Sequence, residues 1–310
     1  MKLHQLHEFI AIADCGSIRA AARFLGLSQP ALTKSLHRLE EEMHVQLVVR
    51  TTHGVELTAY GNALLGRARL IQAESQKIHQ EIAQMRGEKE GTLTVGLSPT
   101  VATLLLPPAL NQFRKDYPNV RLNIVGGLYH THLPEIRAGT MEFAIGPIPA
   151  EGLGPDFSSE PLFFNNTVIA CRKSHYLRDA TRLADLQDAD WALYGRVRHG
   201  PGASIVEAFQ QAGLSLPRIV VQCSSIAGLI ALVAHSDILC ILAREMLDQE
   251  PLCNGLHSIT IQESLPRYLI TLFRKASSPL SPAAAHLATL LRRQSSYLNQ
   301  ERDAPIVSNG

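Results

Sequence analysis

The feature that most constrains the fold is a pair of glycine turns near the start of the chain, each ending a short amphipathic helix. Apolar residues recur at steps of three and four before Gly16 and Gly26, which is the period of a helix with one buried face. Ser17 and Ser28 then supply N-caps for the helices that follow. Short helices joined by tight turns can bury their apolar faces only against one another. The sequence therefore predicts a three-helix unit that contains a helix-turn-helix.

The third predicted helix begins after Ser28 and carries an apolar stripe on one side. At about 100° per residue the polar residues lie opposite this stripe. The stripe is formed by Leu32, Leu36, Leu39 and Met43. Polar side chains on such a helix can reach base edges in the major groove of DNA, and free N–H groups at its N-terminus attract phosphate. The candidate DNA-binding residues of this segment are Ser28, Gln29, Pro30, Thr33, Lys34 and His37.

Two short apolar strands are predicted next, at residues 45–50 and 55–57, around a turn that contains Gly54. A hairpin directly after a groove-reading helix is typical of a wing. Arg50 and His53 therefore join the candidate DNA-binding residues. Periodicity alone is equally consistent with a small three-helix bundle whose polar face is solvated, and the order of these features is what favours a winged unit.

The segment at residues 28–40, followed by residues 47–50 and 55–58, closely resembles the DNA-binding signature of LysR-type transcriptional regulators. The resemblance implies a winged helix-turn-helix, a linker helix, an effector domain and a double-stranded DNA operator as partner, with RNA polymerase as a further candidate partner. It also leads us to expect a basic residue at the wing tip, where this chain has His53. The acidic run at residues 40–42 should point away from the DNA or pair with Arg38, and we interpret it as a solvated helix end.

A long helical segment after Thr58 repeats apolar residues at alternating steps of four and three. This period of about 3.5 residues is typical of a coiled-coil seam. We predict a linker helix that joins two copies of the chain, with pairing of dimers into a homotetramer as a further expectation. Packing of the helix against its own domain is the alternative. The candidate dimerisation residues are Leu64, Ala68, Ile71, Ile78 and Ile82.

From residue 91 onward, short apolar runs alternate with helical patterns, including one helix expected over residues 101–116. Two such βαβ series imply parallel sheets and an α/β effector domain of two lobes, similar to periplasmic binding proteins. An all-α winged helix-turn-helix domain and a long linker helix precede it. The predicted domains are residues 1–58 for DNA binding, 59–90 for the linker and 91–310 for effector binding, with lobe I at about 91–163 and 267–310 and lobe II at about 164–266.

Ligands of open α/β sheets bind beyond the carboxyl ends of strands, against helix N-termini. Arg196, Arg198 and His199 precede a glycine turn at such a position and would favour a carboxylate, sulfonate or phosphate group. We therefore expect a small organic anion as effector and no cofactor. Serine and glycine are also common at helix starts for structural reasons alone. The candidate effector-binding residues are Ser98, Thr100, Thr131, Gly146, His199, Gly202, Ser204 and Ser225.

Composition and missing motifs narrow the function further. The net charge is only +1. The prediction of DNA binding therefore depends on how particular residues are arranged, and not on an excess of basic residues. Nucleotide-binding, nucleophile-elbow and zinc-protease motifs are absent from the sequence, which predicts no catalytic residues and a protein that is not an enzyme. His130 and His132 lack a third ligand at a recognisable spacing, so we expect no metal. Without an apolar span or signal-like opening, a cytoplasmic protein with no membrane contact is expected.

Two other functions are weighed against a DNA-binding regulator. A solute-binding protein of a transport system would share the two lobes, but it would need an export signal and would leave the helix-turn-helix unexplained. A redox-sensing regulator would need reactive thiols. The five cysteines are an odd number without any C-x-x-C spacing, which favours neither a disulfide framework nor a zinc site.

Overall fold

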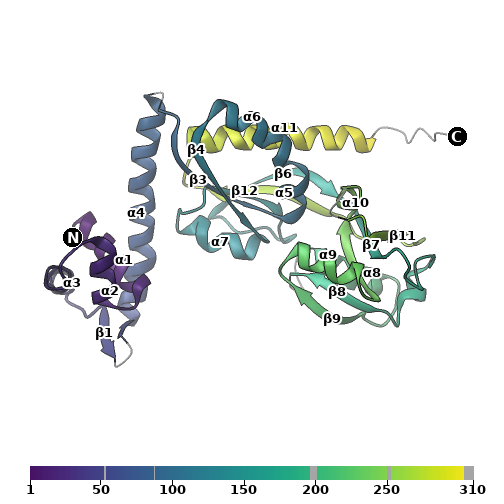
Figure 1. Cartoon of the computed structure of the whole chain (residues 1–310), viewed down its shortest axis with the longest axis horizontal. Helices are drawn as coiled ribbons and strands as arrows, with labels where there is room; N and C mark the ends of the chain where they lie inside the picture. Colours follow the sequence, from purple (N-terminus) through teal and green to yellow (C-terminus); the bar gives the residue numbers. More distant parts are fainter. Residues whose placement is uncertain (52–53, 87, 196–200, 250–252, 304–310) are drawn as a thin grey trace. The chain divides into compact units, whose positions relative to one another are not determined.

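The computed structural model describes residues 1–310 except 52–53, 87, 196–200, 250–252 and 304–310 (Figure 1). The chain divides into two units, the first formed mainly by residues 1–88 and the second by most of residues 89–310. Among the described residues, no helix combines the length and the apolar character that a membrane crossing requires.

The first unit is a winged helix-turn-helix followed by a long helix. Gly16 and Gly26 adopt the left-handed conformation, with φ of 61° and 67°, as the caps that end the first two helices. The core is formed by apolar residues of the first three helices, including Phe9, Ile12 and Leu32. The elements are α1 (Leu3–Cys15), α2 (Ile18–Leu25), α3 (Gln29–Met43), β1 (Val48–Thr51), β2 (Gly54–Leu57) and α4 (Ala59–Met85).

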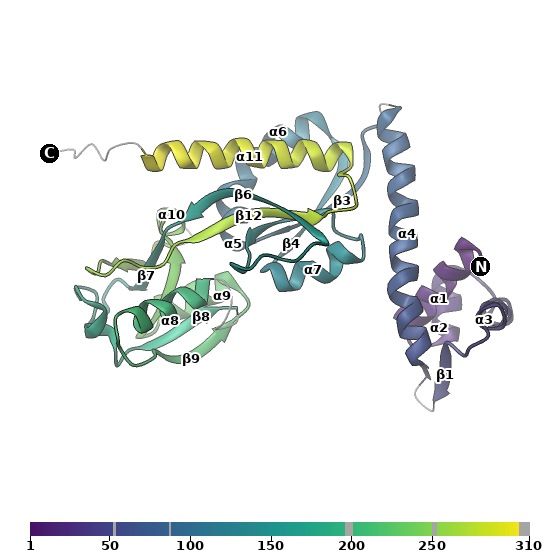
Figure 2. The ribbon, with the colours of Figure 1, turned by 180° about the vertical axis from the view of Figure 1, so that it is seen from behind.

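The second unit contains two five-stranded sheets, one in each lobe. In the first sheet the strand order is β4-β3-β5-β12-β6, with β4, β3 and β5 parallel and β12 antiparallel to both of its neighbours. Helices α6 and α11 lie side by side over this sheet and share its core (Figure 1, Figure 2). The elements are β3 (Glu90–Leu97), α5 (Pro99–Leu104), α6 (Leu106–Asp116), β4 (Asn119–Gly126), α7 (Tyr129–Arg137), β5 (Phe143–Pro147), β6 (Phe157–Asn165), β12 (Tyr268–Lys275) and α11 (Pro282–Asp303).

The second sheet has the order β11-β7-β10-β8-β9. Strands β10, β8 and β9 are parallel, whereas β7 is antiparallel to β10 and β11. Trp191 and Phe209 belong to one core cluster of this lobe, and Leu229 and Val233 belong to another. The elements are β7 (Thr167–Arg172), a 3-10 turn η1 (Leu183–Leu186), β8 (Asp190–Tyr194), α8 (Pro201–Gln211), β9 (Arg218–Cys223), α9 (Ile226–Ala234), β10 (Ile238–Ala243), α10 (Arg244–Leu247) and β11 (Leu256–Ile259).

Three details of the second unit differ from the sequence-based prediction. Both sheets are mixed and not purely parallel, because the strands that connect the lobes run against their neighbours. The helix expected over residues 101–116 is broken at Leu105, where Pro107 and Pro108 follow and proline cannot donate to the preceding turn. Strands β6, β8 and β11 were not predicted.

The chain crosses between the lobes twice, at adjacent positions. The first crossing follows β6 and the second precedes β12, and these two strands are paired with Asn165 opposite Tyr268. The amide of Asn165 donates to the Tyr268 hydroxyl, and the Thr167 hydroxyl donates to the carbonyl of Pro266 at 3.1 Å. Side-chain hydrogen bonds therefore tie the two connecting segments together.

Candidate DNA interface and effector cavity

The polar side of α3 forms a shallow concave surface in the first unit. Ser28 caps the helix by accepting from the Ala31 N–H at 3.3 Å. Lys34 and His37 are exposed and Thr33 is half-buried, so these side chains are available to a partner. The side chain of Arg50, and His53 as a whole, lie outside the described residues. The concave surface is lined by Gln29, Pro30, Thr33, Lys34, His37, Arg38 and Glu41.

The acidic run at the end of α3 is not simply a solvated helix end, as the sequence suggested. Glu40 is nearly buried, and its Oε1 accepts from the N–H of Leu47 at 2.9 Å and of Val48 at 3.4 Å. Its Oε2 lies 3.4 Å from Nδ1 of His37. Glu40 therefore ties the recognition helix to the first strand of the wing.

The wing is held by backbone contacts that leave no room for a side chain. The Val55 N–H donates to the Gly16 carbonyl at 2.8 Å. A Cβ added at Gly54 would lie 2.3 Å from that same carbonyl oxygen. The wing is thus packed against the turn between α1 and α2, which places it beside α3 as the winged fold requires.

The heptad seam of α4 divides into two halves with different roles. Ala68 is fully buried against Leu6 and Ile10 of α1, and Leu64 packs on the same cluster. The prediction that Ala68 mediates dimerisation is therefore corrected, because its side chain is wholly taken up by the core of its own unit. Leu64 is only partly buried, so its part in dimerisation stays a prediction. By contrast, the last three predicted seam residues have exposed apolar side chains, at 37% for Ile71, 51% for Ile78 and 53% for Ile82.

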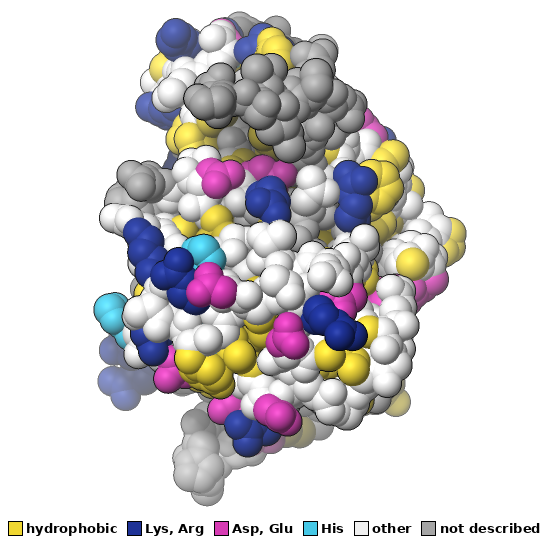
Figure 3. Space-filling model, turned by 90° about the vertical axis from the view of Figure 1, so that its right-hand side faces the viewer, with side chains coloured by type: hydrophobic (Ala, Val, Ile, Leu, Met, Phe, Trp, Pro, Cys, Tyr) yellow, Lys and Arg dark blue, Asp and Glu magenta, His cyan; other side chains and the backbone are white. Residues whose placement is uncertain are grey.

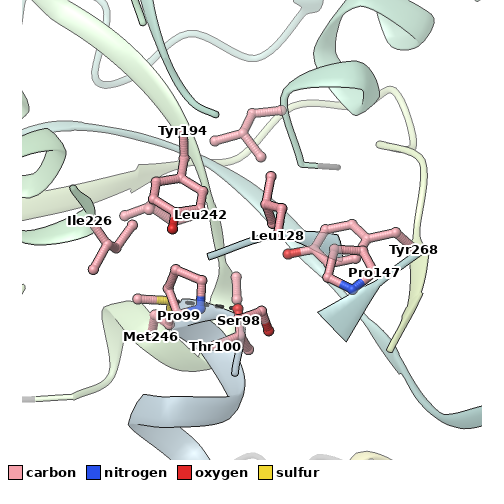
Figure 4. Close-up of a pocket in the computed structure, with 12 residues that line it drawn as sticks. Ser98, Pro99, Thr100, Leu128, Pro147, Tyr194, Ile226, Leu242, Met246 and Tyr268 are labelled. Atoms are coloured by element: carbon pink, nitrogen blue, oxygen red, sulfur yellow. Dashed lines mark hydrogen bonds between the residues drawn. The ribbon is translucent and has the colours of Figure 1, made fainter. Parts of the chain in front are cut away.

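A cavity in the second unit is lined by residues from both lobes. The space between the atoms that line it, counted together with the solvent at its open mouth, is about 370 Å³. Figure 4 shows the hydroxyl ends of Tyr194 and Tyr268 pointing from different sides toward the space between the lining residues. The lining residues are Ser98, Pro99, Thr100, Leu128, Pro147, Tyr194, Ile226, Ile241, Leu242, Ala243, Met246 and Tyr268.

Ser98 and Thr100 are the two residues with aliphatic hydroxyls in the described wall of this cavity. Ser98 directly follows β3, its N–H donates to the Ile145 carbonyl at 2.9 Å, and its side-chain oxygen is buried without a hydrogen-bond partner. The Thr100 hydroxyl donates to the sulfur of Met246 across the lobes at 3.7 Å. Gly146 packs behind Ser98, because a Cβ at this position would lie 3.1 Å from the Ser98 Cβ. Gly146 therefore supports the cavity wall without lining it.

Four of the remaining predicted effector residues are described, and they lie outside the cavity wall. Thr131 donates to the Leu128 carbonyl at 2.7 Å, and Ser225 caps α9 by accepting from Gly228 at 3.2 Å. Gly202 and Ser204 are buried in the first turn of α8. His199 lies outside the described residues, together with Arg196 and Arg198. The cavity thus unites Ser98 and Thr100 with tyrosines and apolar residues that sequence reasoning missed, since no local motif marks them.

The histidines and cysteines of the second unit have surroundings typical of packing. His132 is buried beside Gly96, and burial lowers its pKa. Burial raises the pKa of Cys171 to about 11, and it also raises those of Cys240 and Cys253. These thiols stay protonated near neutral pH, which disfavours redox sensing through them. In the part of the chain that the structure describes, no three potential metal ligands lie close together.

The surface charge is mixed. Figure 3 shows Lys and Arg side chains interspersed with Asp and Glu on one face of the molecule. This agrees with the net charge of +1. Recognition of a charged partner must therefore come from local groups such as those on α3.

Comparison with known proteins covers nearly the whole chain. The family model of the LysR substrate binding domain matches residues 86–296, and that of the bacterial regulatory helix-turn-helix protein, lysR family, matches residues 3–62. The HTH-type transcriptional regulator TdcA of Escherichia coli (strain K12) is 29% identical over 296 residues, which cover 96% of this chain and 94% of TdcA. The HTH-type transcriptional regulator GbpR of Azospirillum brasilense is 29% identical over 306 residues, with 95% and 87% covered.

Solved structures show the same fold. The crystal structure of CbnR, a LysR family transcriptional regulator, matches with a TM-score of 0.71 at 24% identity, covering 95% of this chain and 99% of CbnR. A structure of full-length CbnR complexed with its target DNA matches with the same TM-score. The winged helix-turn-helix and the two-lobed α/β unit are the parts that these proteins share with this one. The chain therefore belongs to the LysR family of DNA-binding transcriptional regulators.

Proposed function

We propose that this regulator acts in the cytoplasm as a homodimer that binds an operator with dyad symmetry and is controlled by a small organic anion in the cavity between its lobes. Pairing of dimers into tetramers and contact with RNA polymerase complete the proposal. In this proposal residues 1–58 bind DNA, residues 59–90 mediate dimerisation and residues 91–310 bind the effector. One observation carries the effector part, namely the buried, unpartnered hydroxyl of Ser98 in a cavity lined by both lobes.

The exposed polar residues of α3 support the DNA part of the proposal. A helix that presents Thr33, Lys34 and His37 on one side can contact base edges and phosphates in a major groove. The N-terminus of α3 at Ser28 offers further N–H groups to a phosphate. In this arrangement His37 serves base recognition, whereas Lys34 supplies charge.

We expect Lys34→Ala to weaken binding to all sequences and to lower the salt slope by about one, because one phosphate contact is lost. His37→Ala and Thr33→Ala should instead relax base preference. The measurement is a titration with DNA selected from a random pool by the wild-type chain, repeated at several salt concentrations. Lys115→Ala, at an exposed position of α6, is the matched control and should leave the slope unchanged. Affinity and preference unchanged in all three α3 variants would show that another surface reads the DNA.

An effector in the cavity can act as a switch because the cavity wall comes from both lobes. Ser98 and Leu128 belong to the first lobe, whereas Tyr194 and Met246 belong to the second. A ligand shifts a conformational equilibrium only through unequal affinity for the two states. Closure of the lobes around a ligand provides that inequality, and the two adjacent chain crossings are the natural hinge.

Removal of the Ser98 or Thr100 hydroxyl should weaken binding of an organic anion by about one to two decades, since a hydrogen bond to a charged group contributes about 1.5–3 kcal/mol. Operator binding without effector should stay as in the wild type. The measurement is calorimetric titration of the acids that a thermal-shift screen selects, with Ser98→Ala, Thr100→Ala and the control Thr289→Ala on the exposed side of α11. Equal affinities in all variants would move the effector site away from this cavity.

A further inference from the structure

We propose that Glu40 selects the base that His37 reads, by fixing which nitrogen of the His37 ring carries its proton. The selected tautomer presents a hydrogen-bond acceptor to the DNA, so His37 reads a base with an amino group in the major groove, cytosine or adenine. The inference rests on the proposed function, from which it takes His37 as a base-reading residue. It adds the residue that positions His37 and the class of base that is read.

The carboxylate of Glu40 is held in one orientation. Its Oε1 accepts from the backbone N–H groups of Leu47 and Val48, at 2.9 Å and 3.4 Å, at the start of the wing. The side chain is only 12% exposed, so it has little freedom to turn toward water. The second oxygen, Oε2, therefore stays beside His37, where it lies 3.4 Å from Nδ1 of the ring.

This contact decides the tautomer of the neutral ring. A neutral imidazole has one N–H and one acceptor nitrogen, and the partner of one nitrogen sets the state of the other. A carboxylate accepts hydrogen bonds and donates none, so the proton of His37 lies on Nδ1, next to Glu40. The other tautomer would place the lone pair of Nδ1 against a negative oxygen. Nε2 is therefore left as an acceptor.

The ring carries this acceptor into the concave surface of α3. The His37 side chain is 63% exposed and lines that surface together with Thr33 and Lys34. Nε2 is the ring nitrogen farther from the backbone, so it is the one that a base edge meets. In the major groove, cytosine and adenine present amino groups, whereas guanine and thymine present the acceptors O6 and O4. An acceptor on His37 therefore favours cytosine or adenine at the base that it contacts.

Glu40 also holds the wing, and one substitution separates this structural role from its effect on His37. In Glu40→Gln the amide oxygen can still accept from Leu47 and Val48, but the amide nitrogen donates where Oε2 accepted. The proton of His37 then moves to Nε2, and the ring presents a donor. We therefore expect the preferred base to change to guanine or thymine. In Glu40→Ala, by contrast, the wing amides lose their partner and affinity falls for all sequences.

The test is selection of operator half-sites from a random DNA pool by the full chain at pH 8, where histidine is ordinarily neutral. The base that His37 contacts is the one whose preference is lost in His37→Ala. At that base Glu40→Gln should reverse the preference by at least about fivefold, the low end of the cost of one mismatched base pair. With His37→Ala already present, Glu40→Gln should change nothing there.

Glu42→Gln is the matched control for the lost charge. Glu42 is exposed in the last turn of α3, and its partner is the N-terminal amine of Met1. This substitution removes the same charge two residues away without touching the contact with His37, so base preference should stay as in the wild type. A wild-type preference for guanine or thymine at the base that His37 contacts would overturn the inference.

Nuclear magnetic resonance of the ring nitrogens tests the tautomer without DNA. In the full chain labelled at the histidine nitrogens, the signals of His37 are those that disappear in His37→Ala. At pH 8 they should show the proton on Nδ1 in the wild type and on Nε2 in Glu40→Gln. If Glu40→Gln loosens the wing, the wild-type spectrum alone decides, because a proton on Nε2 contradicts the inference.

The proposed function and this inference fail in different ways. If His37→Ala changes no base preference, His37 does not read DNA, and its proposed role and the inference fail together. If His37→Ala relaxes the preference but Glu40→Gln behaves as the wild type at that base, His37 remains a base-reading residue. In that case Glu40 only holds the wing, and the inference alone is overturned.

Discussion

Replacing Ile78 and Ile82 together by lysine is expected to convert the protein to monomers and to lower operator affinity by about 100-fold or more. Both side chains are more than half exposed on α4, at 51% and 53%, so the substitutions leave the fold of one chain intact. Two lysines from each copy would meet in an apolar seam without a partner. Loss of the dimer removes the gain of about 10²–10⁴ that linking two binding modules provides.

Sedimentation equilibrium and titration with selected operator DNA would measure these two effects. Asn62→Lys is the matched control, because Asn62 is exposed on the side of α4 opposite the seam at about 100° per residue. It adds the same charge to the same helix and should leave dimers intact. Stable dimers in the double lysine variant at micromolar concentration would show that the effector domains hold the protein together.

Replacing Gly61 by alanine is expected to destabilise the DNA-binding unit by roughly 3 kcal/mol or more, the range of severe core substitutions. A Cβ on Gly61 would lie 2.1 Å from the carbonyl oxygen of Leu47, a backbone atom that cannot move aside cheaply. The same carbonyl accepts from the N–H of Thr58 at 3.0 Å. The substitution would therefore separate α4 from the first strand of the wing.

Hydrogen–deuterium exchange in the full chain would locate this effect. Amides in residues 29–57 should exchange about 100-fold faster in Gly61→Ala, while those of β3 and β4 stay protected. Gly66→Ala is the control on the same helix, since a Cβ there meets nothing within 4 Å. Because glycine is a poor helix former, Gly66→Ala should stabilise α4 by about 1 kcal/mol. Normal protection in Gly61→Ala would mean that the contact between α4 and Leu47 is dispensable.

Local signals in the sequence were sufficient to predict the helices of the DNA-binding unit. Capping serines, left-handed glycines and a 3.6-residue apolar period act within one or two turns of chain, so they can be recognised without knowing any distant contact. The helix predicted between the cap Ser17 and the turn at Gly26 is α2, Ile18–Leu25, in the structure. Ser98 and Thr100 were selected by the rule for strand ends in α/β sheets, which depends on chain order alone, and both residues line the cavity between the lobes.

The tertiary structure decided the features that depend on residues far apart in the chain. Strand β6 contains Pro161 and polar residues, so its pattern is weak, and it becomes a strand by pairing with β12 at the edge of the first sheet. The role of Glu40 appeared only once the wing amides were placed beside it. The division of the α4 seam depended on where α1 packs.

The cavity between the lobes shows the same distinction most clearly. Ser98 carries a sequence signal, but Tyr194, Met246 and Tyr268 lie about 100 to 170 residues further along the chain and have no motif of their own. They meet Ser98 because the chain crosses between the lobes twice and returns through β12. The sequence alone thus predicted many of the helices and strands, and it showed which hydroxyl residues follow the ends of strands. Only tertiary packing determined which side chains share a cavity, because burial is a property of neighbours that the chain brings together from a distance.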